Sequence, residues 1–104
     1  MKNMGIEYKF TAKLYFYSSS GGDTHGWYFL SLPEDMAKEI RENLKSLEEG
    51  WGRLKVKAKI GRSEWRTAIW FDTKHNSYLL PIKAEIRKKE NIEIDKDIEV
   101  IIWI

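Results

Sequence analysis

Residues 51–92 read WGRLKVKAKIGRSEWRTAIWFDTKHNSYLLPIKAEIRKKENI, and this stretch decides the fold. Residues 53–60 and 64–71 each alternate apolar and polar side chains, which is typical of half-buried β-strands. The short Gly-Arg-Ser turn between them predicts a hairpin. Residues 77–80 predict a further short strand, and the proline that follows marks the start of a helix over residues 81–90.

The rest of the chain predicts three more strands and a longer helix. Residues 6–17 alternate and are rich in aromatic side chains, which favours a strand, and residues 27–32 favour a second one. Pro33 begins an amphipathic helix that Gly50 ends, and residues 97–104 form the last strand. The order strand, Leu-Pro, helix, strand therefore occurs twice. Together these elements predict a mostly β protein, a barrel or pseudobarrel of about six strands capped by two α-helices.

The alternation also predicts which large side chains are buried. Phe16 shares the inward face of the first strand, and Leu47 lies on the apolar face of the first helix. Trp27 and Trp65 align with apolar neighbours, so we expect all four side chains in the core. Trp70 has outward parity on its strand and is a candidate aromatic contact.

Composition limits the class of protein. The 104 residues suit a single domain, residues 1–104, with a substantial core. Cysteine is absent, which excludes disulfides and thiolate metal sites and predicts a cytoplasmic location. No apolar run approaches the ~20 residues of a membrane helix, so we expect no membrane partner. The absence of glutamine alongside many charged residues is a thermophile pattern, which codon bias explains equally well.

Positive charge is concentrated in residues 51–89, which contain 11 Lys or Arg and 3 Asp or Glu, in a chain of net charge +2. If the strands at 6–17 and 53–60 are neighbours, their outward lysines form one cationic surface. Cations interleaved with aromatic side chains suit a phosphate backbone with unstacked bases. A solvated sheet face is the ordinary alternative. The candidate anion-binding side chains of this surface are Arg53, Lys55, Lys57, Lys59 and Arg66, with Trp70 as aromatic contact.

The predicted second helix offers another candidate anion site. Lys83 and Arg87 are four residues apart and share a helix face. We expect Lys83 in the first turn, where free backbone amides attract a phosphate or carboxylate. Alternatively, the amides face water and Arg87 pairs with Glu90 or Asp97.

No group of residues predicts catalysis or a cofactor. His25 and His75 lie near Asp23 and Asp72, and these four could bind zinc only if their two loops meet. Exposed loop histidines are the ordinary interpretation. The serines at 18–20 have no identifiable base, so they support no nucleophile. We therefore assign no catalytic residue, no metal ligand and no cofactor.

Several motifs taken together resemble a small prokaryotic family. WGRLKVKAKIG at 51–61, WRT at 65–67 and YLLPIKAEIRK at 78–88 are similar to the domain of unknown function 1905 family, and FTAKL at 10–14 also fits. The resemblance implies a double-split β-barrel, an architecture shared with AbrB-like transition regulators and antitoxins, whose chains dimerise to complete it. Two units in one chain imply that this chain closes the barrel alone. Lys96 departs from the glycine that relatives carry before the final strand.

Charge and resemblance favour a non-enzymatic binding module for an anionic partner, either nucleic acid or a phosphorylated ligand, that acts through the basic sheet face. One alternative is a small-molecule or enzyme-like site near Lys83, Arg87 and Trp65. Another is an interaction module that acts together with a further domain. Both the monomer and the homodimer stay open, and analogy of fold does not establish DNA binding.

Overall fold

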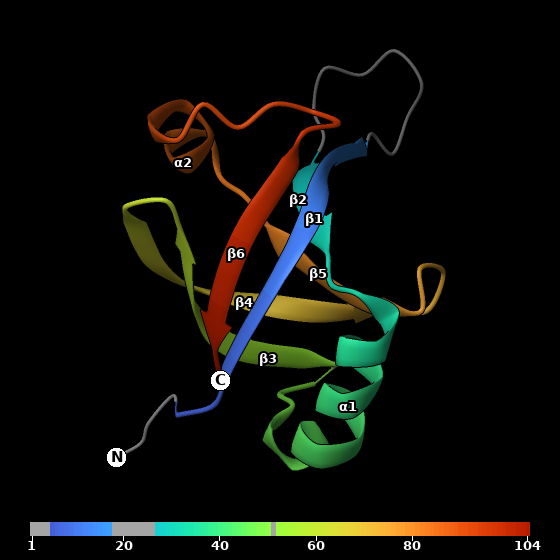
Figure 1. Cartoon of the computed structure of the whole chain (residues 1–104). Helices are drawn as coiled ribbons and strands as arrows, with labels where there is room; N and C mark the ends of the chain where they lie inside the picture. The colour runs from blue at the N-terminus through green and yellow to red at the C-terminus, as the bar shows by residue number, and fades with distance from the viewer. Residues whose placement is uncertain (1–4, 18–26, 51) are drawn as a thin grey trace.

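Six antiparallel strands close into a barrel, and two α-helices lie at opposite ends of it (Figure 1). The computed structural model describes residues 5–17, 27–50 and 52–104. Around the barrel the strands follow the order β1-β2-β5-β4-β3-β6. The predicted fold class is therefore confirmed. The strands are β1 (Glu7–Tyr17), β2 (Trp27–Ser31), β3 (Arg53–Ile60), β4 (Ser63–Asp72), β5 (Ser77–Pro81) and β6 (Asp97–Trp103), and the helices are α1 (Glu34–Leu44), the 3-10 turn η1 (Lys45–Leu47) and α2 (Ala84–Lys89).

Strand β6 closes the barrel because it pairs on both of its sides. It pairs with β1 over seven positions and with β3 over three. Its inward side chains Ile98, Val100 and Ile102 are buried, as the alternation predicts. The turn before β6 uses left-handed backbone at Asp95 (φ 70°) and not at Lys96. Lys96, which stands in place of a glycine, therefore adopts an ordinary backbone conformation with negative φ.

The barrel consists of two similar units. Strands β2 and β5 each span five residues, and each is followed by two residues and then a helix. Leu30 and Leu80, 50 positions apart, face each other where β2 and β5 pair. The repeated Leu-Pro motif does not follow this relation, because Pro33 directly precedes α1 whereas Pro81 is the last residue of β5. The prediction that the second helix starts at Pro81 is wrong. The helix starts at Ala84, directly after Lys83, whose backbone is extended (ψ 160°).

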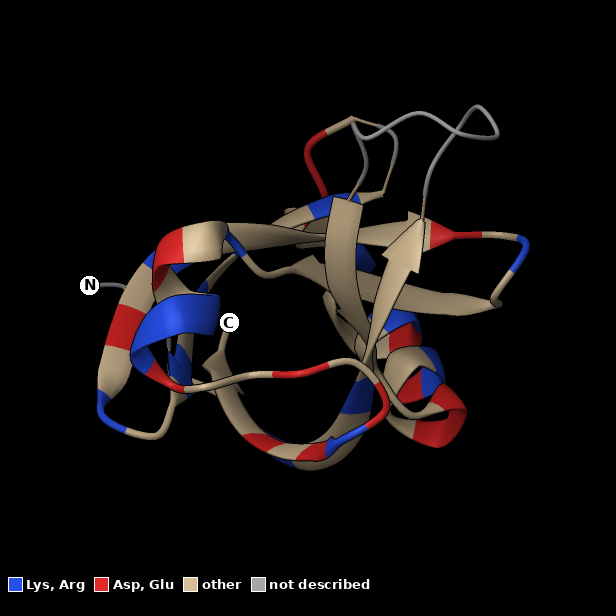
Figure 2. Cartoon of the chain, turned by 90° about the horizontal axis from the view of Figure 1, so that it is seen from above, with Lys and Arg blue, Asp and Glu red and all other residues tan. Residues whose placement is uncertain are grey.

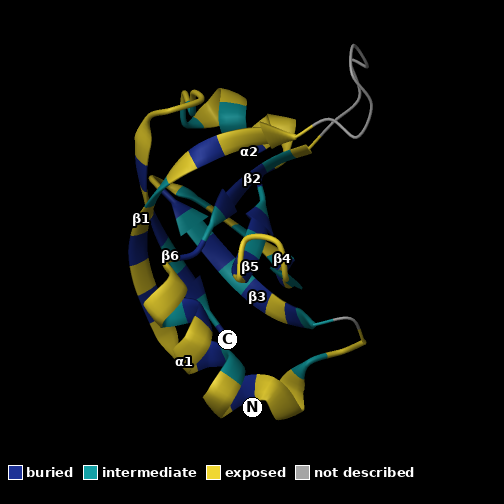
Figure 3. Ribbon diagram, turned by 90° about the vertical axis from the view of Figure 1, so that its right-hand side faces the viewer, coloured by how far each residue is buried: buried dark blue, intermediate teal, exposed yellow. Residues whose placement is uncertain are grey.

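The alternation in β3 produces the barrel core. Leu54, Val56, Ala58 and Ile60 are all buried, and their polar neighbours point outward (Figure 3). Burying such apolar side chains stabilises the fold by about 1.5–3 kcal/mol each. Buried residues from all six strands meet in this one cluster. The described part of the chain contains no helix long and apolar enough to cross a membrane.

Three side chains that we expected in the core are exposed. Trp27 faces outward and is 61% exposed. The continuous apolar run at the start of β2 does not show which of its residues face inward. Leu47 is 55% exposed, because α1 ends at Leu44 and the 3-10 turn breaks the helical spacing. Phe16 is 40% exposed and packs against the ring of Tyr28. Trp65, in contrast, is partly buried and packs against the core.

A hydrogen-bonded network fastens α1 and η1 to the barrel. The fully buried Tyr78 donates its hydroxyl to Glu48 Oε2 at 2.8 Å. Arg41 of α1 also pairs with this carboxylate at 3.4 Å, and its guanidinium lies 3.9 Å from the centre of the Phe71 ring. Burial, followed by the hydrogen bond to Glu48, raises the pKa of the Tyr78 phenol far above its ordinary value.

We expect Tyr78→Phe to lower the free energy of unfolding by about 1–3 kcal/mol, because it removes a hydrogen bond to a half-buried carboxylate. Urea unfolding at neutral pH measures this change. The raised pKa adds a second effect. Above about pH 10 the phenol ionises in the unfolded chain but stays protonated in the folded one, so stability falls as the pH rises.

The Tyr78→Phe variant lacks this phenol and should show a smaller loss of stability between about pH 9 and pH 11 than the parent protein. The lysines titrate in both proteins and cancel in the comparison. Parallel stability curves over this range would contradict the assigned burial of Tyr78.

Candidate anion-binding site

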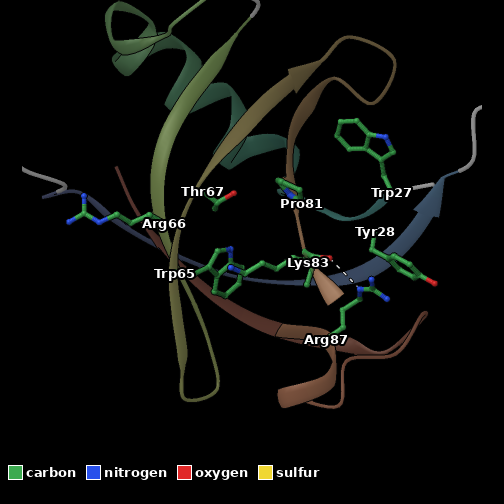
Figure 4. Close-up of a pocket in the computed structure, with 9 residues that line it drawn as sticks. Trp27, Tyr28, Trp65, Arg66, Thr67, Pro81, Lys83 and Arg87 are labelled. Atoms are coloured by element: carbon green, nitrogen blue, oxygen red, sulfur yellow. Dashed lines mark hydrogen bonds between the residues drawn. The ribbon is translucent and has the colours of Figure 1, made fainter. Parts of the chain in front are cut away.

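The barrel opens on one side, between β4 and α2. Strands β4 and β5 pair from Trp70 to Asp72, and the earlier part of β4 runs apart from β5. A cavity of about 390 Å³ occupies this opening, which we call the α2 pocket (Figure 4). It is lined by Trp27, Tyr28, Trp65, Arg66, Thr67, Pro81, Ile82, Lys83 and Arg87.

Two side chains hold helix α2 in place, so the wall of the α2 pocket is well defined. The guanidinium of Arg87 lies 3.5 Å from the centre of the Tyr28 ring and donates to the carbonyl of Ile82 at 3.3 Å. At the end of the helix, Glu90 accepts a 2.6 Å hydrogen bond from the hydroxyl of Ser63. These contacts join α2 to β2 and to the β3–β4 hairpin.

Three cationic residues line the α2 pocket: Lys83, Arg87 and Arg66. Lys83 extends toward the indole of Trp65, whereas Arg66 points away from Lys83 over the outer face of the barrel (Figure 4). None of the described lining residues is a carboxylate. Glu85 approaches Lys83 at 3.9 Å, but both side chains are more than half exposed, so this pair contributes little. The pocket is therefore a concave, positively charged site with an aromatic wall.

Comparison with known proteins places the chain in a family. The model of the family described as "Domain of unknown function (DUF1905)" matches residues 10–102. The chain belongs to the DUF1905 family. The resemblance inferred from residues 51–61, 65–67 and 78–88 is thereby confirmed. No curated protein matches this DUF1905 chain.

The predicted basic face of the DUF1905 chain, on β3 and β4, is partly neutralised. Glu49 pairs with Arg53 at 2.6 Å and with Lys55 at 3.4 Å, and Glu64 pairs with Lys57 at 2.9 Å. The hydrogen bond from Lys57 lowers the pKa of the Glu64 carboxyl. Figure 2 shows acidic and basic residues interspersed along the chain. The local charge of the sequence therefore overstates the charge of this surface.

Strands β1 and β3 are not neighbours, contrary to the expectation on which the continuous lysine surface rested. Strand β6 lies between them, and Lys9 and Lys59 both pair with Ile101 on its two sides. Farther along β1, Lys13 pairs with Asp97 at 2.8 Å. The strand order follows from long-range pairing, which alternation along one strand cannot reveal.

The other candidate sites remain apart from the α2 pocket. His75 contacts Asp72 within the β4–β5 turn, and this hydrogen bond lowers the pKa of the Asp72 carboxyl. His25 and Asp23 lie outside the described residues. Within the described ranges, no group of three or more His, Asp or Glu residues could hold a metal ion.

Sequence reasoning grouped Lys83, Arg87 and Trp65 as an alternative site, and the structure brings these three together. Sequence reasoning missed Tyr28, whose ring stacks against the Arg87 guanidinium, and Thr67, which also lines the pocket. The inward parity of Tyr28 relative to Leu30 was the available signal. Lys83 precedes α2 instead of lying in its first turn, and α2 spans six residues, so side chains provide the charge of the pocket.

The position of α2 can be tested through Gly61, which has φ +58° and directly faces Glu90. A Cβ at this position would lie 2.0 Å from Glu90 Oε1, so Gly61→Ala must displace the carboxylate that holds α2. Gly50 has φ +47° with nothing within 4 Å of a Cβ, so Gly50→Ala provides a control for backbone strain alone.

We expect Gly50→Ala to lower the free energy of unfolding by about 1–2 kcal/mol. Gly61→Ala should cost about 1 kcal/mol or more beyond that, because it also breaks the bond between Glu90 and Ser63. Urea denaturation of both variants measures the difference. Equal losses would show that Glu90 does not fasten α2 to the hairpin.

Proposed function

We propose that this protein is a non-enzymatic module that binds a phosphate-bearing ligand in the α2 pocket. The observation that carries the proposal is the lining of the pocket, where Lys83 and Arg87 lie among aromatic side chains and no described lining residue is a carboxylate. The one carboxylate near Lys83 is the exposed Glu85 at 3.9 Å, a weak partner that leaves the lysine charge available for an incoming anion. Charge-assisted hydrogen bonds from lysine and arginine to phosphate are shorter and stronger than neutral ones.

The α2 pocket supports this function better than the β3 side of the basic face. Binding an anion at Lys57 must first displace Glu64, which already forms a 2.9 Å ion pair. Lys83 has a far weaker internal partner, at 3.9 Å. The α2 pocket is also concave, so a ligand there loses more of its contact with water, which strengthens its electrostatic interactions.

The aromatic wall adds a preference for a planar group. Trp65 is partly buried and immobilised by the core, and its indole lies beside Lys83 (Figure 4). A base or another flat ring can stack on such an indole while its phosphate reaches the neighbouring cation, and stacking contributes about 1–3 kcal/mol per base. A nucleotide combines both groups, so it is the first probe to use.

We expect ATP to bind and to raise the melting temperature in proportion to the logarithm of its concentration, as mass action requires. Adenosine, which lacks the phosphates, should bind much more weakly. Lys83→Ala should reduce ATP affinity by about tenfold in isothermal titration calorimetry, because one charge-assisted contact is lost.

The matched control is Lys88→Ala, since Lys88 is an exposed lysine of α2 that does not line the α2 pocket. This variant removes the same charge and should retain ATP affinity within about twofold. Two results would overturn the proposal: ATP binding no tighter than adenosine binding, or equal losses in the two lysine variants.

A further inference from the structure

A second hollow lies on the outer face of the barrel, beside the α2 pocket. It has a volume of about 480 Å³ and runs between β3 and β4, and we call it the β4 hollow. Arg66 and Thr67 line both the β4 hollow and the α2 pocket. The two cavities therefore adjoin at β4, and a path from one to the other crosses this strand where it does not pair with β5. The remaining lining residues of the β4 hollow are Arg53, Lys55, Val56, Ala68 and Trp70.

The β4 hollow exists because Ala68 is small. Ala68 lies on the outward side of β4, two residues from Arg66 and two from Trp70, and opposite Lys55 on β3. Its methyl group forms a floor between these longer side chains. Trp70 is 39% exposed, and the Arg53 guanidinium lies 5.5 Å from the centre of its ring. The indole therefore provides a wall that is both accessible and oriented.

The β4 hollow keeps a positive charge despite its ion pairs. A single carboxylate, Glu49, is shared by Arg53 and Lys55. Arg66 forms no ion pair with any other described residue, and it stands where the two cavities meet. The path thus presents a tryptophan in each cavity and an arginine between them.

We propose, resting on the function proposed above, that the ligand is single-stranded nucleic acid that crosses β4 from the α2 pocket to the β4 hollow. One base stacks on Trp65 and a later one on Trp70, while Arg66 contacts the phosphate between them. Accessible indoles spaced along a cationic groove bind single strands because unpaired bases expose their faces. A duplex keeps its bases stacked inside and cannot use these walls. A mononucleotide fills one cavity and leaves the other empty.

The first test compares thymidine monophosphate with oligothymidylates of three and six residues, using tryptophan fluorescence quenching at fixed salt. The six-residue strand should bind about tenfold or more tightly than the monophosphate, because the second contact becomes intramolecular. A duplex of the same sequence should bind more weakly than the single strand. Equal affinity for the monophosphate and the hexamer would overturn this inference and leave the proposed function standing. Failure of both to bind would overturn the proposed function itself.

The second test uses a gain of affinity, which loss of folding cannot produce. Glu49→Gln releases both Arg53 and Lys55 and should tighten hexamer binding by about threefold or more, with little effect on the monophosphate. Glu42→Gln removes the same charge from the exposed side of α1 and provides the control. Equal gains in the two variants would exclude the β4 hollow from the binding path.

A third variant blocks the path. Ala68→Glu raises the floor of the β4 hollow and places a carboxylate opposite Lys55. It should weaken hexamer binding by about tenfold while leaving monophosphate binding unchanged, since Ala68 does not line the α2 pocket. A hexamer affinity that survives this substitution would overturn the proposed route across β4.

Discussion

The two-sided pairing of β6 is the interaction on which the rest of the structure depends. It joins the last strand of the chain to the first, and it connects the β1–β2 hairpin with the β3–β4 hairpin. A sheet can satisfy the backbone hydrogen bonds at its margins by closing on itself. Closure here combines long pairings with short ones, and the short pairing of β4 with β5 leaves the opening that becomes the α2 pocket.

Residues that obey a strict alternation could be predicted closely from the sequence. The bounds of β3 were predicted without error, and Leu54, Val56, Ala58 and Ile60 face inward as expected. The apolar run Trp27-Tyr28-Phe29-Leu30 carries no such alternation, and Trp27 was wrongly predicted to lie in the core. Strand order depends on pairings between distant segments, so the separation of β1 from β3 by β6 could not be predicted from either strand alone.

The candidate site shows the same division. Lys83 and Arg87 were identified from their helical spacing, and the structure brings them together with Trp65. The partners that neutralise the basic face could not be identified in this way. Glu64 lies in the segment whose charges were counted, and it pairs across the hairpin with Lys57. A count of charges along a segment describes a surface only after its carboxylates have been placed.

The two similar units of the barrel have come to hold different chemistry. In one unit, the hollow beside α1 is lined by the carboxylates Glu34, Asp35 and Glu42 together with Lys38 and Arg41. In the other unit, the described charged residues that line the α2 pocket are all cations. The network of Tyr78 and Glu48 joins the residue after η1 to β5, and neither residue lines the α2 pocket. Such a division makes the barrel evolvable, because the specificity of one end can change while the other preserves the fold.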